Sequence, residues 1–221
     1  MTRILAIDTT AEIGSLALLE DVELREELLI KSEDGFAQLL FAHIDRLLKR
    51  HGWPLDSIGC FAAAAGPGSF TGVRVGLTAA KGFAETLGKR AVGVSNLEAI
   101  ASFGHAELRA PVCDARRGEV YGAVYRSDGT VEQEERVLRF GEWLAHLPAT
   151  AELISPTPSL FAPMLRGTRF EEREFTQAPR GLAAAVGRIA AVRHSVLGDP
   201  VAMDANYVRR SDAELFWRDR S

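Results

Sequence analysis

The sequence predicts an α/β protein and raises the question whether it consists of two similar lobes; one observation supports the class and a second suggests the duplication. Strand-like and helical segments alternate along most of the 221 residues, which is the pattern of α/β domains. In addition, an apolar strand, an Asp-led polar turn and a second apolar strand occur at the start of the chain and again in its middle. The length fits two small lobes or one large domain. We place the lobes at residues 1–108 and 109–221, with a tail that could pack back on the first lobe.

The first lobe opens with a hairpin, after which helices and strands follow in turn. Ile4–Ile7 is an apolar strand, Asp8–Gly14 is a polar turn, and Ser15–Leu19 is the second strand. The other predicted elements are a strand at 23–30, a helix within 35–52, a buried strand within 57–66, a helix from Ser69 or Thr71 to about Leu87, a strand at 90–96 and a short helix from Asn96.

The second lobe repeats the opening and then becomes less regular. Residues 110–129 have the pattern strand, turn, strand, and Asp114 stands where Asp8 stood. An aspartate after a strand is also a common turn residue, so this pair alone leaves the duplication open. The later segments are a short helix at 140–148, a proline-rich loop over 152–165, a helix within 179–195 that a Gly-Asp-Pro stop follows, and an extended tail from 204.

Composition excludes several classes of protein. The chain is 25% charged and 47% hydrophobic, which is typical of a globular domain and not of a disordered chain. A net charge of −4 disfavours a protein that binds nucleic acid over its whole surface. No apolar run approaches the roughly 20 residues of a membrane span, and the start of the chain lacks a signal-peptide cleavage site. Cys60 and Cys113 lie in apolar runs and are interpreted as core residues, so we expect a cytoplasmic protein without a disulfide.

Residues 62–88 are rich in glycine; their sequence is AAAAGPGSFTGVRVGLTAAKGFAETLG. The first part indicates the end of a strand and a turn, and the second part a helix. A Walker loop would have a lysine after Gly72, where Val73 stands, and the glycines are spaced one residue too far apart for a dinucleotide fingerprint. A tight turn and a capped helix start explain some of the glycines. An anion bound at the N–H groups of the helix start stays a third possibility.

The two helices of the first lobe have unusually wide apolar faces. On the second helix, Arg74, Thr78, Lys81 and Glu85 fall in an arc of roughly 60°, and nearly every other position is apolar or small. Its internal glycines cost roughly 0.5–1 kcal/mol each relative to Ala, which the close approach of another backbone would offset. On the first helix the apolar arc spans roughly 200°, about twice the stripe of a one-sided helix.

We infer from these arcs that the two helices form a protein–protein interface. Burial of both helices inside one two-lobed fold is the alternative. His43 lies at the edge of the apolar arc and is interpreted as an interface or surface residue, not as a metal ligand. The predicted interface residues are Phe36, Leu39, Leu40, His43, Ile44, Leu47, Gly72, Gly76, Ala79, Ala80 and Phe83.

Five motifs resemble, in this order, those of the bacterial TsaB (YeaZ) family: ILAIDTT, AAGPGSFTGVRVG, GVSNLEAIA, DARRGEVYGAVY and NYVRR. The resemblance covers Ile4 to about Arg210, apart from roughly 136–176. It implies the actin-like ATPase (ASKHA) fold, with two ribonuclease-H-like lobes. It also implies a non-catalytic subunit that binds and activates the related subunit TsaD through the two N-terminal helices, or pairs with itself when alone. Together with TsaE, such a complex threonylcarbamoylates the tRNA adenosine next to the anticodon, and this chain would contact tRNA only indirectly.

The same resemblance raises the question of a nucleotide site. An actin-like ATPase uses an Asp-led hairpin in each lobe, and Asp8 with Thr9 and Thr10, and Asp114, stand at matching positions. A late Gly-x-Gly turn is not evident, and turn formation or capping is the alternative role of both aspartates. We expect no tightly bound cofactor and no metal site, although ATP or ADP with Mg²⁺ could bind at the interface of a complex.

Two enzymatic alternatives stay open. An active ATPase or kinase of the actin-like superfamily would depend on Asp8 and would turn over ATP without a partner. A metallopeptidase-like protein would need metal ligands, but no His-x-x-x-His pair exists, and His43 and His51 are eight residues apart. Many family members have a histidine near the start of the first helix, where this chain has Gly35 or Phe36. We do not expect the chain to be an enzyme by itself.

Overall fold

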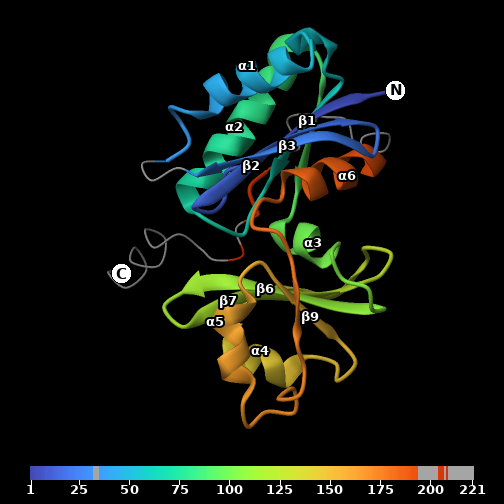
Figure 1. Cartoon of the computed structure of the whole chain (residues 1–221). Coiled ribbons are helices and arrows are strands. Elements are labelled where there is room, and N and C mark those ends of the chain that lie inside the picture. The colour runs from blue at the N-terminus through green and yellow to red at the C-terminus, as the bar shows by residue number, and fades with distance from the viewer. Residues whose placement is uncertain (32–34, 194–203, 207, 209–221) are drawn as a thin grey trace, which may run out of the picture. The chain divides into compact units, whose positions relative to one another are not determined.

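The computed structural model describes residues 1–31, 35–193, 204–206 and 208 (Figure 1). Contacts divide the chain into two units, Met1–Ala99 with Pro179–Ala205, and Ile100–Ala178 with Asn206–Ser221. The division thus falls at 99–100 and not at the expected 108–109, and a late segment groups with the first unit. The predicted stop at 198–200 and most of the NYVRR motif lie outside the described residues.

The first unit is a mixed sheet with the strand order β3-β2-β1-β4-β5. Strands β1, β2 and β3 pair antiparallel, whereas β4 and β5 continue the sheet parallel to β1. Its elements are β1 Arg3–Asp8, β2 Ile13–Glu20, β3 Glu23–Lys31, α1 Leu40–Arg50, η1 Leu55–Ser57, β4 Cys60–Ala64, α2 Phe70–Leu87, β5 Arg90–Val94, α3 Asn96–Ala101, which crosses the division, and α6 Ala183–Arg193.

Helices cover both faces of this sheet (Figure 1). A Cβ on Gly76 of α2 would lie 3.5 Å from Ile7, whereas a Cβ on Gly187 of α6 would lie 3.3 Å from Ala6. Neighbouring residues of a strand point to opposite faces, so α2 and α6 lie on opposite sides of β1. The core between the sheet and α1 and α2 contains Leu5, Ile7, Leu16, Leu18, Leu40, Ile44, Leu47, Val73, Leu77 and Ala80.

The ends of the helices follow from local chemistry. The Ser69 hydroxyl accepts a hydrogen bond from the Gly72 N–H at 3.3 Å, and α2 ends at Gly88, whose φ of 62° favours glycine. Helix α1 begins at Leu40, within the predicted segment 35–52 but five residues after its start, because residues 37–39 form turns. The first helix of the unit is therefore shorter than its apolar pattern.

Three neighbouring strands supply the acceptors for the start of α6. The N–H groups of Leu182, Ala183 and Ala184 donate to Asp8 Oδ2, Ser15 Oγ and Glu27 Oε1 at 3.0, 2.9 and 3.0 Å. The first N–H groups of a helix have no partner inside the helix, so such acceptors satisfy them. Asp8, at the end of β1, thereby fixes where α6 begins.

The second unit has its own mixed sheet, of order β10-β9-β6-β7-β8. The proline-rich segment 152–165, predicted as a loop, contains β9, which pairs with β6 and with β10. That prediction is wrong because a buried parallel strand of four residues is too short to show a period. The elements are β6 Leu108–Arg116, β7 Glu119–Arg126, β8 Val131–Arg139, α4 Phe140–His146, β9 Glu152–Ser155, α5 Pro158–Phe161, η2 Ala162–Leu165 and β10 Phe175–Gln177.

The two sheets have the same topology. When each is taken from its antiparallel edge, the orders are β3-β2-β1-β4-β5 and β8-β7-β6-β9-β10. In chain order, a helix follows each of the last three strands of each sheet: α1, α2 and α3 follow β3, β4 and β5, and α4, α5 and α6 follow β8, β9 and β10. Asp8 ends β1, and Asp114 lies near the end of the equivalent strand β6. The predicted α/β fold of two equivalent lobes is confirmed.

Both cysteines are free, as the sequence analysis expected. Cys60 is buried in β4, and burial raises the pKa of its thiol to about 11. Cys113 is half-buried in β6, and desolvation, together with the nearby Glu135 and Asp114 carboxylates, raises its pKa to about 12. Among the helices in the described part of the chain, none combines the length and apolarity needed to cross a membrane.

Candidate protein interface

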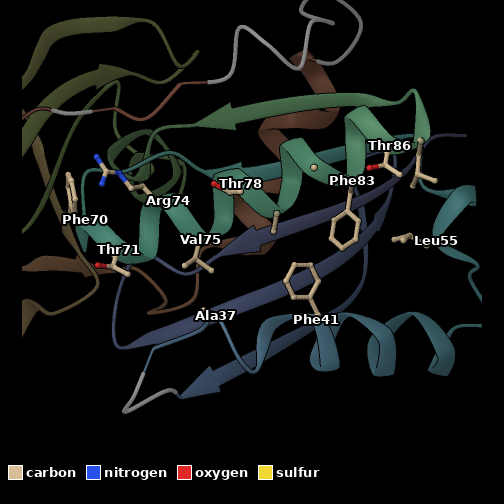
Figure 2. Close-up of a pocket in the computed structure, with 13 residues that line it drawn as sticks. Ala37, Phe41, Leu55, Phe70, Thr71, Arg74, Val75, Thr78, Phe83 and Thr86 are labelled. Carbon is tan, nitrogen blue, oxygen red and sulfur yellow. The ribbon is translucent and has the colours of Figure 1, made fainter.

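A groove of about 740 Å³ lies between α1 and α2 of the first unit (Figure 2). Phe41 of α1 and Phe83 of α2 point toward each other across it, with ring centroids 5.7 Å apart in an edge-on arrangement. Phe83 also stacks on Phe61 of β4, at 5.3 Å between centroids. The aromatic wall of the groove therefore rests directly on the sheet.

The groove presents apolar surface to solvent. Of the 13 described residues that line it, only Arg74 is charged; the others are apolar residues, glycine or threonine. Phe41 is 56% exposed and Phe70 is 44% exposed. Fully burying a side chain of this kind contributes about 1.5–3 kcal/mol, so covering these rings would be favourable. A partially exposed aromatic surface in a groove is typical of a binding site.

The structure separates the predicted interface residues into two groups. Leu39 is exposed, and His43 and Phe83 are half-buried. The other predicted residues are buried inside the unit, where they support the helices; of these, only Ala79 also lines the groove. This second group is Phe36, Leu40, Ile44, Leu47, Gly72, Gly76, Ala79 and Ala80.

Gly72 and Gly76 do not make room for a partner, contrary to the prediction. A Cβ on Gly72 would lie 2.0 Å from the Thr9 carbonyl oxygen, and a Cβ on Gly76 would lie 2.7 Å from Thr9 Oγ1. Thr9, in the β1–β2 turn of the same unit, therefore occupies the space beside both glycines, with its backbone at Gly72 and its hydroxyl at Gly76. Gly82 is different: it lines the groove, and the described residues place no atom of another segment within 4 Å of its would-be Cβ.

Several groove residues are absent from the interface that the sequence predicts. Phe41 lies within the apolar arc of the first helix and could have been chosen for its size. Arg74 and Thr78 were assigned to the polar strip of α2, but both line the groove. Leu55 comes from the short helical turn after α1, and no periodicity connects it with α2. Only packing places these residues together.

The β1–β2 turn, proposed as one half of a nucleotide site, is occupied by internal hydrogen bonds. Asp8 Oδ1 accepts from the Thr10 N–H at 3.0 Å and from the Thr10 hydroxyl at 2.6 Å. Thr9 Oγ1 donates to the Gly72 carbonyl at 2.6 Å, and Asn96 Nδ2 donates to Thr10 Oγ1 at 2.6 Å. With the bond from Leu182, the turn joins β1 to the starts of α2, α3 and α6.

A nucleotide with Mg²⁺, which the fold would imply, does not fit these residues. Both Asp8 oxygens already accept hydrogen bonds, and the residue is only 1% exposed. Burial raises the pKa of the Asp8 carboxyl, although the bonds from Thr10 and Leu182 oppose this. In the second unit, Asp114 Oδ1 accepts from the Arg116 N–H at 2.8 Å. Within the described residues no group of three or more His, Cys, Asp or Glu could hold a metal ion.

Both aspartates thus have the alternative role that the sequence analysis considered, namely turn formation and, for Asp8, capping. Thr9 and Thr10, the other candidate nucleotide residues, are engaged in the same network. A nucleotide at the interface of a complex stays a prediction.

Comparison with known proteins gives a consistent result. Residues 31–203 match the family model described as TsaD: tRNA N6-adenosine threonylcarbamoyltransferase. The tRNA threonylcarbamoyladenosine biosynthesis protein TsaB of Bacillus subtilis is 34% identical over 149 residues, which are 65% of this chain and 65% of that protein. The protein of the same name from Escherichia coli is 38% identical over 131 residues, 57% of this chain and 56% of that protein. The matched segments therefore span less than two thirds of either relative.

The fold also recurs in a solved structure. YeaZ from Pseudomonas aeruginosa superimposes with a TM-score of 0.73 at 24% identity, covering 94% of this chain and 100% of that one. Together with the repeated sheet topology, this likeness shows the actin-like, two-lobed α/β fold.

Proposed function

The chain belongs to the TsaB (YeaZ) family and carries a TsaD-type domain, and from this premise we propose that it acts in the biosynthesis of tRNA threonylcarbamoyladenosine. In this proposal it is a non-catalytic subunit that binds and activates a TsaD-type transferase. The transferase would threonylcarbamoylate the adenosine next to the anticodon, TsaE would join the complex, and the chain would meet tRNA only indirectly.

The groove between α1 and α2 is the observation that carries this proposal. It combines the exposed rings of Phe41 and Phe70 with a small-residue floor at Ala79 and Gly82. Aromatic residues contribute much of the free energy at protein interfaces, and small residues let a partner's side chains enter. A partner helix that lays an apolar face into the groove would cover both.

The β1–β2 turn supports an accessory role in a different way. In this unit the Asp8 carboxylate and the Thr9 and Thr10 hydroxyls hold helices in place. These polar groups, which a phosphotransferase of this fold would turn toward its nucleotide, serve here to position α2, α3 and α6. The chain would then act by presenting the surface of α2, and the chemistry would belong to the partner.

Activation needs no contact with the substrate. If the groove binds only the active conformation of the transferase, association raises the population of that conformation by the difference in affinity. When no transferase is present, a second copy of the chain could occupy the same groove, since a self-complementary patch yields a closed dimer.

A blocking substitution tests the proposal. In Gly82→Leu the new side chain would fill the groove, and because its Cβ has open space the variant should fold. We expect it to lose measurable affinity for the TsaD-type subunit in isothermal titration calorimetry and to stop stimulating threonylcarbamoyl transfer to tRNA. Gly141→Leu on α4 is the matched control, because Gly141 is also an exposed helical glycine with open space at its Cβ.

The control should bind and stimulate as the wild type does. Wild-type affinity of Gly82→Leu, with its folding confirmed by circular dichroism, would contradict the assignment of the groove. ATP turnover by the pure wild-type chain would favour the enzymatic alternative instead.

A further inference from the structure

We propose that the end of the groove at the start of α2 receives a carboxylate side chain of the partner subunit, which Arg74 binds. This specifies the chemistry of the partner and rests on the proposed function, because it takes the groove as the surface that the transferase covers. The rest of the partner's inserted segment would be apolar, to match Phe41, Val75 and Phe83.

The charge of the groove is concentrated at one end. Arg74 is the only charged residue among the described residues that line it. Its guanidinium carbon lies 3.6 Å from the centroid of the Phe70 ring, and Figure 2 shows both side chains at the N-terminal end of α2. Toward the other end, around Leu55 and Thr86, the lining is uncharged.

When Arg74 stacks on Phe70, the edges of its guanidinium group can still donate hydrogen bonds to a carboxylate. The ring contacts the face of the guanidinium, whereas its five N–H donors lie in the guanidinium plane. That number of donors can serve more than one acceptor at a time, so a partner carboxylate can add to bonds that already exist. Stacking also reduces the freedom that the side chain would lose on binding.

The helix itself adds positive potential at the same place. The aligned peptide dipoles of the 18-residue α2 give its N-terminus a partial positive charge. The first turn of α2, which the structure describes in full, contains no acidic residue that would offset this charge. Thr71 and Thr78 also line the groove, one turn of helix from Arg74 on either side. They lie about 10 Å apart along the helix axis, so one of their two hydroxyls, and not both, can donate to the carboxylate that Arg74 binds.

The complement of such a groove is an apolar segment with one negative side chain at a defined end. An ion pair of this kind, closed off from water by the surrounding apolar contact, selects the register and orientation of the partner. A guanidinium and a carboxylate can form two parallel hydrogen bonds, which adds geometric specificity. The proposal therefore predicts how the partner lies in the groove as well as where it binds.

The test is a charge reversal with a matched control. Arg74→Glu should raise the dissociation constant for the TsaD-type subunit by on the order of tenfold or more. Arg188→Glu makes the same change at an exposed position of α6, on the other face of the sheet, and should change affinity by less than about twofold. Exchange of exposed Asp and Glu residues of the partner to Arg, one at a time, should find one variant that restores binding to Arg74→Glu.

The outcomes separate this inference from the function on which it rests. If Arg74→Glu binds as the wild type does while Gly82→Leu fails to bind, the carboxylate contact is wrong and the groove assignment stands. Equal weakening by Arg74→Glu and Arg188→Glu would show a general charge effect and would also overturn the contact. If the wild-type chain does not bind the transferase at all, the proposed function fails and this inference fails with it.

Discussion

Thr9 and Gly72 are locked together by reciprocal contacts between a strand end and a helix start. Thr9 Oγ1 donates to the Gly72 carbonyl at 2.6 Å, and a Cβ on Gly72 would lie 2.0 Å from the Thr9 carbonyl oxygen. Since the nearest atoms to that Cβ are the carbonyl oxygen and carbon of Thr9, which belong to the backbone, position 72 leaves no room for a side chain. The position of α2, and with it the shape of the groove, depends on this pair.

We predict that Gly72→Ala destabilises the chain by about 1–3 kcal/mol or more, because the added methyl group meets a carbonyl oxygen that cannot move away. Gly82→Ala in the same helix should instead add about 0.5–1 kcal/mol, since its Cβ has open space and alanine favours the helix. Urea unfolding of both variants measures the difference. Equal effects would contradict the packing described for Thr9.

The Thr9 hydroxyl can be tested without changing its shape. Thr9→Val removes the hydroxyl that donates to the Gly72 carbonyl. That carbonyl lies inside α2 and keeps the backbone bond of the helix, so the change should cost about 0.5–1.5 kcal/mol, the net contribution of one hydrogen bond. Because the bond positions α2, affinity for the TsaD-type subunit should fall as well. Denaturant unfolding and calorimetric titration give the two readouts. An unchanged unfolding free energy would mean that the hydrogen bond contributes little.

The raised pKa of the Asp8 carboxyl predicts that the stability of the chain depends on pH. Burial raises its pKa above the ordinary value of 3.8, so the folded chain holds a proton that the unfolded chain releases. Stability contributed by Asp8 is therefore fully present below about pH 3.8 and declines as pH rises through the folded pKa. We therefore compare the unfolding free energies of the wild type and Asp8→Asn. The wild-type value minus the variant value should fall as the pH rises above about 3.8.

Urea unfolding of the wild type and Asp8→Asn at several pH values measures this difference, in which the other titrating groups largely cancel. A difference that grows with pH would show that the hydrogen bonds from Thr10 and Leu182 outweigh burial. In that case Asp8 would act as an ionised cap of α6.

The two cysteines should resist thiol reagents in the folded state. With a pKa of about 11, the Cys60 thiol is ionised to about one part in a thousand at pH 8, and the Cys113 thiol to a smaller extent still. Mass spectrometry after iodoacetamide treatment should find both unmodified in the native chain and both modified in urea. Rapid labelling of native Cys113, which is half-buried, would show that solvent reaches its sulfur.

Much of the architecture follows from the sequence alone. The alternation of strands and helices, the recurrence of an Asp-led hairpin and the apolar arcs of α1 and α2 are local patterns with periods of two or 3.6 residues. They predicted the α/β class and two helices with surplus apolar surface. The two equivalent lobes, which the local pattern alone left open, followed from the family resemblance. The sequence also distinguishes the glycine stretch from a Walker loop, because that motif depends on one residue type at one position.

Only the tertiary structure decided which face of each helix is covered. Gly76 was predicted to meet a partner and meets Thr9. Arg74 was placed in the polar arc of its helix and lines the groove. Asp8 caps a helix whose first N–H groups lie 174 residues further along the chain. Helical periodicity shows which side chains share one face of a helix. Which element packs against that face depends on contacts between distant segments. Those contacts are settled by packing and hydrogen bonding in the folded chain, which a local pattern does not contain.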